Sequence, residues 1–560
     1  MIRSLYLSNF KAFGDTGGQP IPIRPLTLIF GPNSAGKSSL IHSLLLAHEA
    51  LHTGNLDVHH TRAGGRSVDL GGFRQYVHRH RTEAPVQWGV ALSVEDLAEK
   101  RLQELLSGAD TLKVLLHIGM EHLEDERTGE VRPVGPPHVR RYEVEIDGKL
   151  LLTMSRRPTG YLQLDRLHTT HPILKRVMEA ILLAYTTTAE IRPDDLHAVE
   201  RSINEITPAL KAQGAGLLPR RLDALRNFSA VGETLFPISR EHRRGDIEGA
   251  TRLFLPRILN TLLEGIHDAL AQTFSRMSYL GPLRSYPPRH FAFSDDQDPN
   301  WQAGGGHAWD LARRDEKIRE AINRWLRSDR LTNPYELRIR RLISDRSEAL
   351  QQQLHRALEE LGKDQAIALI GGALQPNEEG LPEGWDTDLL TRRFMKYLTD
   401  PDAVEGYAEL VLWDVQRETE VSHRDVGVGV SQVLPVLVLA YASENNLIAI
   451  EQPEIHVHPA LQAELGDVFI ESALGPRKNM FLIETHSEHL MLRILRRIRE
   501  QTEGEADPGL PSIRPTDVSV LYVDPCGSDT IVKAIPITED GDFAERWPAG
   551  FFTEREKELF

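Results

Sequence analysis

The chain lacks the residues that mark secreted or membrane-embedded proteins. Among its 560 residues there is a single cysteine, Cys526. One cysteine excludes an intrachain disulfide framework and a cysteine-rich zinc site, and it fits a reducing cytosol. The longest apolar run, Val433 to Ala442, is far shorter than the roughly 20 residues that a membrane-spanning helix needs. The N-terminal residues lack the apolar core of a signal peptide. We therefore predict a soluble, cytoplasmic protein with no membrane partner.

Basic residues are fewer than acidic residues in this chain. Lys and Arg total 65 against 81 Asp and Glu, which gives a formal net charge of −16. This balance excludes a polybasic coat for nucleic acid as a property of the whole chain. Arginines still cluster locally, at 220–221, 243–244, 338–341 and 493–499. For each cluster alone we expect a solvated, ion-paired face, and phosphate contact is the alternative if several share one face of an assembly.

Repeats, low-complexity tracts and sustained heptads are missing as well. Their absence excludes a solenoid, a disordered chain and a long coiled-coil arm. Aromatic residues make up only 6% of the chain, but hydrophobic residues make up 40%, which is enough for a sizeable core. The length predicts at least two lobes.

Strand and helix patterns predict an α/β core that is interrupted in sequence. Residues 26–30 form a continuous apolar run, typical of a strand buried on both faces. Short alternating runs between 86 and 164, with a hairpin signal at Asp147-Gly148, predict an antiparallel sheet. Helical periodicity dominates from 171 to 400.

Strand-like runs then return near 408, at 447–450, at 480–483 and after 518, with helices between them. We therefore predict an α/β fold in which a mixed sheet, an appended antiparallel sheet and a helical insertion combine. The predicted boundaries are 1–165, 166–404 and 405–560.

The segment Gly31–Ser38 is the strongest chemical signal in the sequence. It fits the pattern GxxxxGK[ST], with a strand before it and a helix after it. In this context the glycines let backbone N–H groups face phosphate oxygens, Lys37 supplies positive charge, and the Ser38 hydroxyl can bind Mg²⁺. A glycine turn that binds nothing is the alternative. We predict ATP contacts from a run of seven residues: Asn33, Ser34, Ala35, Gly36, Lys37, Ser38 and Ser39.

Three further elements carry polar groups at strand ends or helix starts. Glu451 ends an apolar strand, where a carboxylate can hold nucleotide-bound Mg²⁺ or merely cap the strand. A glycine-rich turn at 427–429 precedes Ser431-Gln432 and a helix, and such a turn can bind a second anion. His486 follows the next apolar strand, and a structural role is its alternative.

In this order the four elements resemble the ABC-type ATPases related to SMC and RecF proteins. The likeness is greatest to the overcoming-lysogenization-defect-like (OLD-like) ATPases of bacteria, which include the ATPase subunit of Septu-type phage defence. It covers 1–50 and 405–500, and more loosely 280–284, 323–326 and 547–555. The resemblance implies a split ABC-type P-loop ATPase head that uses ATP and Mg²⁺ and that dimerises around sandwiched ATP.

The resemblance also implies a role for each matching position. Gly31–Ser38 corresponds to the Walker A loop, Glu451 to the Walker B acid, and His486 to the switch histidine that senses the γ-phosphate. The signature loop, which reaches the ATP of the other protomer, corresponds to Gly429, Ser431 and Gln432. Gln75 is the candidate for the Q-loop residue and a further metal contact.

One position departs from the family pattern. ABC ATPases usually place a catalytic glutamate after the Walker B acid, but this chain has Gln452 there. An amide cannot take a proton from the attacking water. Either Glu454 serves as the base, or Gln452 only orients the water. In both cases we predict an ATPase with slow turnover that works as a switch.

The sequence offers little for cutting nucleic acid. Related ATPases often carry a Toprim nuclease domain, but the only candidate triplet here is Asp540-Gly541-Asp542, for which a polar turn is the simpler interpretation. No HNH-like cluster is present. We expect no nuclease activity in this chain, a homodimer or higher homo-oligomer, and a separate nuclease or effector subunit, with an HNH nuclease and DNA as candidate partners.

The predicted function is an ATP-dependent regulator of such an effector in bacterial anti-phage defence or DNA maintenance. The alternative is a nucleotide-gated scaffold that controls a protein partner without touching DNA.

Overall fold

The structure is a computed structural model. It describes residues 1–15, 17–124, 131–185, 192–213, 216–223, 243–285, 298–327, 335–343, 406–421, 428–527 and 529–548. The chain divides into two compact units. The first unit comprises Met1–Ser285, Pro299–Gly305 and Val428–Phe560, and the second comprises Tyr286–Asp298 and Gly306–Gly427.

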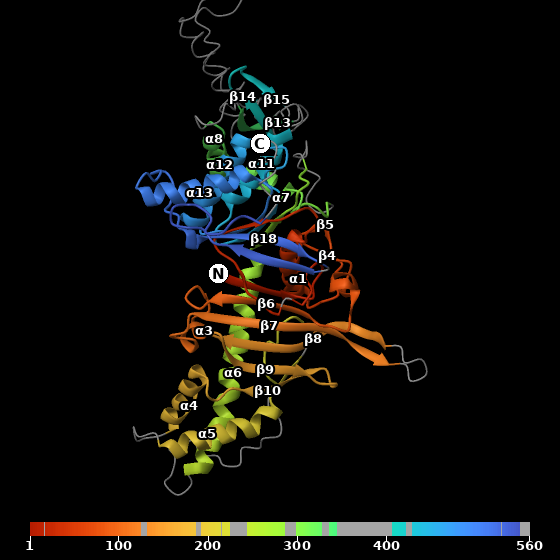
Figure 1. The fold of residues 1–560 in the computed structure, drawn as a ribbon, viewed down its shortest axis with the longest axis vertical. Helices are drawn as coiled ribbons and strands as arrows, with labels where there is room; N and C mark the ends of the chain where they lie inside the picture. The colour runs from red at the N-terminus through yellow and green to blue at the C-terminus, as the bar shows by residue number, and fades with distance from the viewer. Residues whose placement is uncertain are drawn as a thin grey trace, which may run out of the picture. The chain divides into compact units, whose positions relative to one another are not determined.

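A six-stranded sheet forms the centre of the first unit (Figure 1). Its strands are, in spatial order, β12 (Met277–Leu280), β16 (Leu447–Glu451), β17 (Met480–Glu484), β3 (Leu26–Phe30), β18 (Val518–Cys526) and β19 (Asp529–Ile535). The first five are parallel, and β19 closes an antiparallel hairpin. Every residue of β3, β16 and β17 is buried, as the apolar runs predicted. Because these strands are parallel, their carboxyl ends meet at one edge of the sheet.

Four helices accompany this sheet: α1 (Lys37–Thr53), α11 (Val428–Ala442), α12 (Pro459–Leu474) and α13 (Glu488–Glu503). Helix α1 contacts β17, α12 contacts both β3 and β17, and α12 packs on α13. Helix α13 begins after Ser487, whose side chain accepts a hydrogen bond from the Leu490 N–H, as a good N-cap does. The predicted helices near 433–442 and 486–500 are therefore confirmed.

The predicted antiparallel sheet is also present, with eight strands. In spatial order these are β11 (Lys211–Gln213), β10 (Tyr161–Leu167), β9 (Lys149–Arg156), β8 (Val131–Ile146), β7 (Thr111–Glu124), β6 (Val86–Ser93), β1 (Ile2–Ser8) and β2 (Ile21–Pro22). Asp147 and Gly148 link β8 to β9 with φ angles of 50° and 71°, which is the left-handed turn that the hairpin signal predicted.

Helices between 166 and 285 pack onto this sheet. Figure 1 shows α6 (Arg243–Ser275) crossing the strands, and the rings of Trp88 on β6 and Phe274 on α6 lie 6.0 Å apart. Helices α3 (Lys100–Leu105), α4 (Pro172–Tyr185) and α5 (Pro193–Ile206) contact α6. Strand β12 follows α6 and enters the central sheet. The described residues between 166 and 285, predicted as the start of an insertion, thus share one hydrophobic core with both sheets.

Shorter elements complete the first unit near the start of the chain. They are β4 (His60–Thr61), β5 (Gly65–Asp69) and α2 (Phe73–Tyr76).

Where the structure describes it, the second unit contains two helices and a three-stranded antiparallel sheet. These elements are α7 (Gly306–Arg314), α8 (Glu316–Leu326), β13 (Tyr335–Ile343), β14 (Gly406–Asp414) and β15 (Thr419–Val421). The strand predicted near 408 is therefore β14, which belongs to this sheet and not to the central one. Several stretches of the predicted helical insertion, 166–404, lie outside the described residues: 186–191, 214–215, 224–242, 286–297, 328–334 and 344–404.

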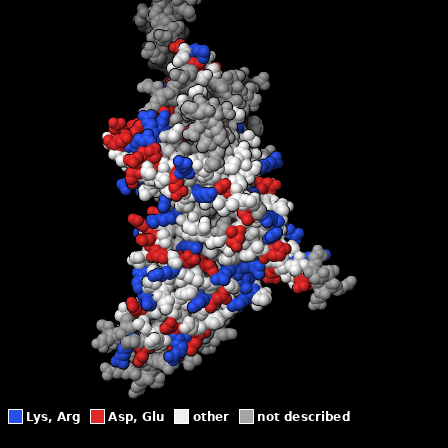
Figure 2. Space-filling model, in the orientation of Figure 1, with Lys and Arg blue, Asp and Glu red and all other residues white. Residues whose placement is uncertain are grey.

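Charges of both signs are interspersed over the face drawn in Figure 2. On β13, Arg338 pairs with Glu336, and Arg340 pairs with Glu409 and Glu420. This pairing is the solvated face expected for that cluster. Within the part of the chain that the structure describes, no helix has the length and apolarity to cross a membrane.

Candidate ATP-binding site

The loop between β3 and α1 has a backbone that requires glycine at two positions. Gly31 has a φ of 147°, and a Cβ there would lie 2.4 Å from the Val523 carbonyl oxygen. Gly36 has a φ of 96°, and a Cβ there would lie 2.4 Å from the Cβ of Ala12. Ser34 also lies in the left-handed region, with a φ of 63°. The loop leads directly into the first turn of α1, whose N–H groups and dipole favour an anion.

Lys37 and Ser38 begin α1 and point to the end of β17. Lys37 is 4% exposed, and its Nζ donates to the carbonyl oxygens of Gly31 at 3.1 Å and Pro32 at 3.0 Å. The same Nζ lies 3.9 Å from Glu484 Oε1. Burial lowers the pKa of Lys37, although Glu484 acts in the opposite direction. The Ser38 Oγ donates to Glu484 Oε2 at 2.6 Å.

Two carboxylates lie at neighbouring strand ends. Glu451 ends β16 and Glu484 ends β17, and the two residues are register partners. Burial, together with the nearby charge of Glu451, raises the pKa of Glu484 to about 7. A hydroxyl and two carboxylates form an oxygen donor set that suits Mg²⁺. Glu484 ends an apolar strand just as Glu451 does, but it is not among the site residues predicted from the sequence.

The side chain of Glu451 is held by residues from two different elements. Tyr279 on β12 donates to Glu451 Oε1 at 3.0 Å, and His42 Nε2 on α1 lies 3.6 Å from the same oxygen. His42 Nδ1 in turn lies 2.8 Å from Lys11 Nζ. An ammonium group can only donate, so Nδ1 accepts and Nε2 carries the proton that faces Glu451. Burial lowers the pKa of His42, which keeps the ring neutral.

Glu454 joins the turns that follow β16 and β17. Its Oε2 accepts from Thr485 Oγ1 at 2.7 Å, and its Oε1 accepts from the His486 N–H at 2.7 Å. Burial raises the pKa of Glu454. Burial, and then the charge of Lys37, lowers the pKa of His486. Both carboxylate oxygens of Glu454 thus hold the turn that carries His486. These contacts are typical of a residue that positions another catalytic group.

This geometry allows the two candidate roles of Glu454 to be separated. If Glu454 only positions the turn, Thr485→Val and Glu454→Gln should each lower ATP hydrolysis about tenfold, because each weakens the same brace. If Glu454 is the general base, Glu454→Gln alone should lower hydrolysis by about 10²–10⁴-fold. We expect the first result in steady-state phosphate-release assays. The positioning role would be contradicted if Thr485→Val hydrolysed ATP at a near-normal rate and Glu454→Gln had no measurable hydrolysis.

Arg284 connects the turn after β16 with α11. Its Nη2 donates to the carbonyl oxygens of Glu451 at 2.8 Å and Gln452 at 3.2 Å, and its Nη1 donates to that of Gln432 at 3.3 Å. Gln432 Nε2 returns a hydrogen bond to the Arg284 carbonyl oxygen at 3.0 Å. Burial lowers the pKa of Arg284 to about 10, below its ordinary value but still well above neutrality. Arg284 lies in the segment 280–284 that carried part of the resemblance, but it was not selected as a site residue.

The predicted signature residues lie in the first turns of α11. A Cβ on Gly429 would lie 2.4 Å from the His456 carbonyl oxygen, so this close approach requires glycine. Ser431 and Gln432 are buried at 0% and 5% exposure. Their predicted contact with the ATP of a second protomer stays a prediction, and a bulky substitution at Ser431 would disturb α11 itself. Gly427 lies outside the described residues.

Gln75 is exposed on α2. The carbonyl oxygen of the next residue, Tyr76, accepts from the Lys11 N–H at 2.7 Å, so α2 borders the Lys11 side of the site. No contact among the described residues joins Gln75 to Ser38 or Glu451. Its predicted part in metal binding stays a prediction.

The Asp540-Gly541-Asp542 triplet fastens the C-terminal segment to α13. Arg499 Nε donates to the Asp540 carbonyl oxygen at 3.0 Å, and Arg499 Nη2 pairs with Asp542 at 3.0 Å. Gly541, with a φ of 69°, lies against the backbone of Leu495. Among the described residues no group of three or more His, Cys, Asp or Glu side chains could hold a metal ion. These contacts agree with the polar-turn interpretation of the triplet.

The other arginines of α13 are also ion-paired. Arg493 pairs with Glu464 and Asp467, and Arg497 pairs with Asp467 and Glu500. This cluster is thus ion-paired, as expected from the sequence, but Arg493 and Arg497 are largely buried and do not form a solvated face.

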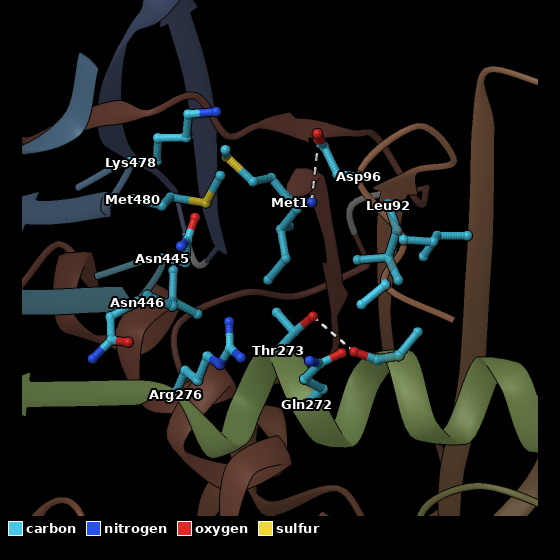
Figure 3. A pocket seen from close by; sticks show the side chains of 15 residues that line it. Met1, Leu92, Asp96, Gln272, Thr273, Arg276, Asn445, Asn446, Lys478 and Met480 are labelled. Atoms are coloured by element: carbon cyan, nitrogen blue, oxygen red, sulfur yellow. Dashed lines mark hydrogen bonds and ion pairs between the residues drawn. The ribbon is translucent and has the colours of Figure 1, made fainter. Parts of the chain in front are cut away.

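A cavity of about 260 Å³ lies at the opposite edge of the central sheet (Figure 3). Its walls include Arg276, Lys478 and the starts of β16 and β17, at Leu447 and Met480. The Met1 amino group pairs with Asp96 at one side of it, at 3.3 Å. The cavity is therefore separate from the phosphate loop, which lies at the carboxyl ends of the same strands.

Comparisons with known proteins agree with an ATPase domain. A family model described as an AAA ATPase domain matches residues 313–491, a range that includes Gly429, Glu451 and His486 but not the phosphate loop. No curated protein matches the chain.

Among solved structures, the SMC head domain from Thermotoga maritima is 9% identical, with a TM-score of 0.32, over 96% of this chain and 99% of that one. An SMC head bound to the C-winged helix domain of ScpA is 10% identical, with a TM-score of 0.34, over 96% and 98%. A head with an extended coiled coil from Pyrococcus furiosus, bound to the C-terminal domain of ScpA, is 10% identical, with a TM-score of 0.32, over 96% of both chains. At these scores the likeness to SMC heads is remote. The chain therefore contains a region similar to an AAA ATPase domain, and this region contributes two carboxylates beside a phosphate loop that the family model does not cover.

Proposed function

We propose that this chain binds ATP with Mg²⁺ at the loop Gly31–Ser38 and hydrolyses it slowly. The observation that carries the proposal is the direct contact of Lys37 and Ser38 with a carboxylate on the adjacent strand. It brings the anion-binding loop, a cation and an acidic group together at one sheet edge. The Ser38 hydroxyl donates its proton to Glu484, so its lone pairs remain available for a metal. Bound Mg²⁺ would neutralise charge on the phosphates.

Slow turnover follows from the residue after Glu451. Gln452 has a left-handed φ of 47°, and its N–H donates to the Glu484 carbonyl oxygen at 2.7 Å. Its side-chain amide cannot take a proton from water. Both oxygens of Glu454 are already engaged with the turn at 485–486. Slow hydrolysis would prolong the ATP-bound state, as the function of a nucleotide-dependent switch requires.

We further propose that ATP joins copies of the chain into a homodimer or higher oligomer through Gly429, Ser431 and Gln432. Because the side chains of Ser431 and Gln432 are buried here, this contact requires the start of α11 to become accessible when ATP binds. Arg284 supports this idea, because it bonds to both the Glu451 turn and α11. A change at the Mg²⁺ site would reach the signature segment through a single guanidinium group.

The same switch would regulate a separate effector, and the resemblance to OLD-like ATPases favours a nuclease in anti-phage defence or DNA maintenance. One observation favours the alternative of a scaffold without DNA contact. The arginines that the sequence singled out on β13 and α13 pair with carboxylates of this chain wherever the structure describes their side chains. Salt-dependent binding of DNA by the ATP-loaded protein would separate the two.

Replacing Glu451 by Gln should stop hydrolysis and trap the ATP-bound oligomer. The amide keeps the hydrogen bond from Tyr279 but removes a negative charge that the Mg²⁺ complex uses. Light scattering should detect a dimer or larger species in Mg²⁺-ATP and a smaller one without nucleotide. The Lys37→Ala variant is the control and should stay in the smaller form. An ATP-bound Glu451→Gln protein that never changes mass would contradict the proposed oligomer.

A further inference from the structure

We propose that Glu484 is the principal acidic residue of the Mg²⁺ site, the place that the sequence pattern assigns to Glu451. The inference rests on the proposed function, because it concerns the metal that accompanies ATP. Both Walker A side chains with a metal or phosphate role contact Glu484. Ser38 Oγ donates to it at 2.6 Å, and Lys37 Nζ lies 3.9 Å from it.

The order of the strands explains this arrangement. Strand β17 lies directly beside β3, which leads into the phosphate loop, and β16 lies one strand further away. The carboxylate at the end of β17 is therefore the one that reaches the start of α1. Among the described residues no hydrogen bond or ion pair joins Glu451 to Lys37 or Ser38, although the charge of Glu451 acts on Lys37 at longer range.

The hydrogen-bond and ion-pair partners of Glu451 are other residues. Its Oε1 accepts from Tyr279 and faces His42 Nε2, and its carbonyl oxygen accepts from Arg284. These partners come from β12, α1 and the segment after β12. They fix the Glu451 side chain beside the metal site, whereas Glu484 alone engages the hydroxyl that would bind the metal.

The negative charge of Glu484 should affect ATP binding in opposite directions without and with Mg²⁺. Without Mg²⁺, a carboxylate beside the phosphate loop repels the triphosphate. With Mg²⁺ present, the same carboxylate would help to hold the metal and so would favour the bound triphosphate. Glu484→Gln is nearly isosteric, and its amide oxygen can still accept from Ser38, so the loop keeps its geometry. A residue with a merely structural role would not produce effects of opposite sign.

Calorimetric titration of the full chain with ATP tests this, once in EDTA and once in Mg²⁺. For Glu484→Gln we expect tighter binding than wild type in EDTA, and an affinity for Mg²⁺ or Mn²⁺ in the ATP complex that falls about 10–100-fold. Electron paramagnetic resonance of Mn²⁺ measures the second quantity without any hydrolysis. Glu451→Gln is the matched control and should lower the metal affinity less.

A double-mutant cycle of Ser38 and Glu484 tests whether the two side chains act together in metal binding. Ser38→Ala should weaken metal binding in the wild type but add little in the Glu484→Gln background, because the two side chains act as a pair. The inference is overturned if Glu484→Gln binds Mn²⁺ like wild type while Glu451→Gln does not. Failure of the wild type to bind ATP would overturn the proposed function itself, and that result is distinguishable from the first.

Discussion

Lys37→Ala is expected to abolish ATP binding while the fold persists. The ammonium group is buried in the loop, where it bonds to the carbonyl oxygens of Gly31 and Pro32 and lies 3.9 Å from Glu484. In the proposed nucleotide complex, phosphate oxygens would replace these carbonyl contacts. Hydrogen bonds to charged groups contribute about 1.5–3 kcal/mol each, so the loss of two or more should weaken ATP binding by at least about 10²-fold.

Calorimetry with Mg²⁺-ATP measures this loss, and circular dichroism checks the fold. Lys478→Ala is the matched control, because this exposed lysine lines the cavity at the opposite edge of the sheet. The control should bind ATP like wild type. Normal affinity in Lys37→Ala would remove the phosphate loop from the site.

Arg284→Met should lower both stability and turnover. The guanidinium donates to three carbonyl oxygens, of Gln432, Glu451 and Gln452, and the residue is 6% exposed. Methionine fills similar space but donates to none of them. Each buried acceptor left without a donor costs about 1–3 kcal/mol, so the free energy of unfolding should fall by about 3 kcal/mol or more. Hydrolysis should fall by at least about 10²-fold, because misplacement of the Glu451 turn by even 1 Å has an effect of that size.

Denaturant unfolding and phosphate release measure the two effects. Arg496→Met offers a control, since this exposed arginine makes a single ion pair, with Glu500. Exposed pairs contribute about 0–1 kcal/mol, so the control should resemble wild type. If Arg284→Met leaves the free energy of unfolding and the rate of ATP hydrolysis unchanged, the Arg284 guanidinium does not hold the Glu451 turn against α11.

Local sequence patterns predicted the parts of this site that depend on local backbone. The Gly31–Ser38 loop follows from its strand, glycines and helix, and Asp147-Gly148 follows from turn chemistry. The buried strands followed from apolar runs because a parallel strand covered on both faces has no polar side.

The same strand-end pattern marks Glu484, but local patterns could not show that Glu484 and not Glu451 contacts the phosphate loop. Its role depends on which strand lies beside β3, and strand order arises from crossovers between distant segments. The same holds for Arg284, which becomes important only when β12 enters the central sheet next to β16.

The predicted domain boundary after residue 165 shows a related limit. Helical periodicity identified α4, α5 and α6, but periodicity does not reveal what an apolar helix face covers. In the structure α6 covers the N-terminal antiparallel sheet, so these helices belong to the first unit. Likewise β14 has a good strand pattern, yet its partners are β13 and β15.

Steady-state release of phosphate from ATP by the purified chain tests the central claim most directly. The account predicts a slow rate that requires Mg²⁺, disappears in EDTA and is absent from Lys37→Ala and Glu451→Gln preparations made in parallel. A rate equal in wild type and both variants, or no Mg²⁺-dependent release from a folded wild-type protein, would contradict the assignment of an ATPase site to the carboxyl edge of the central sheet.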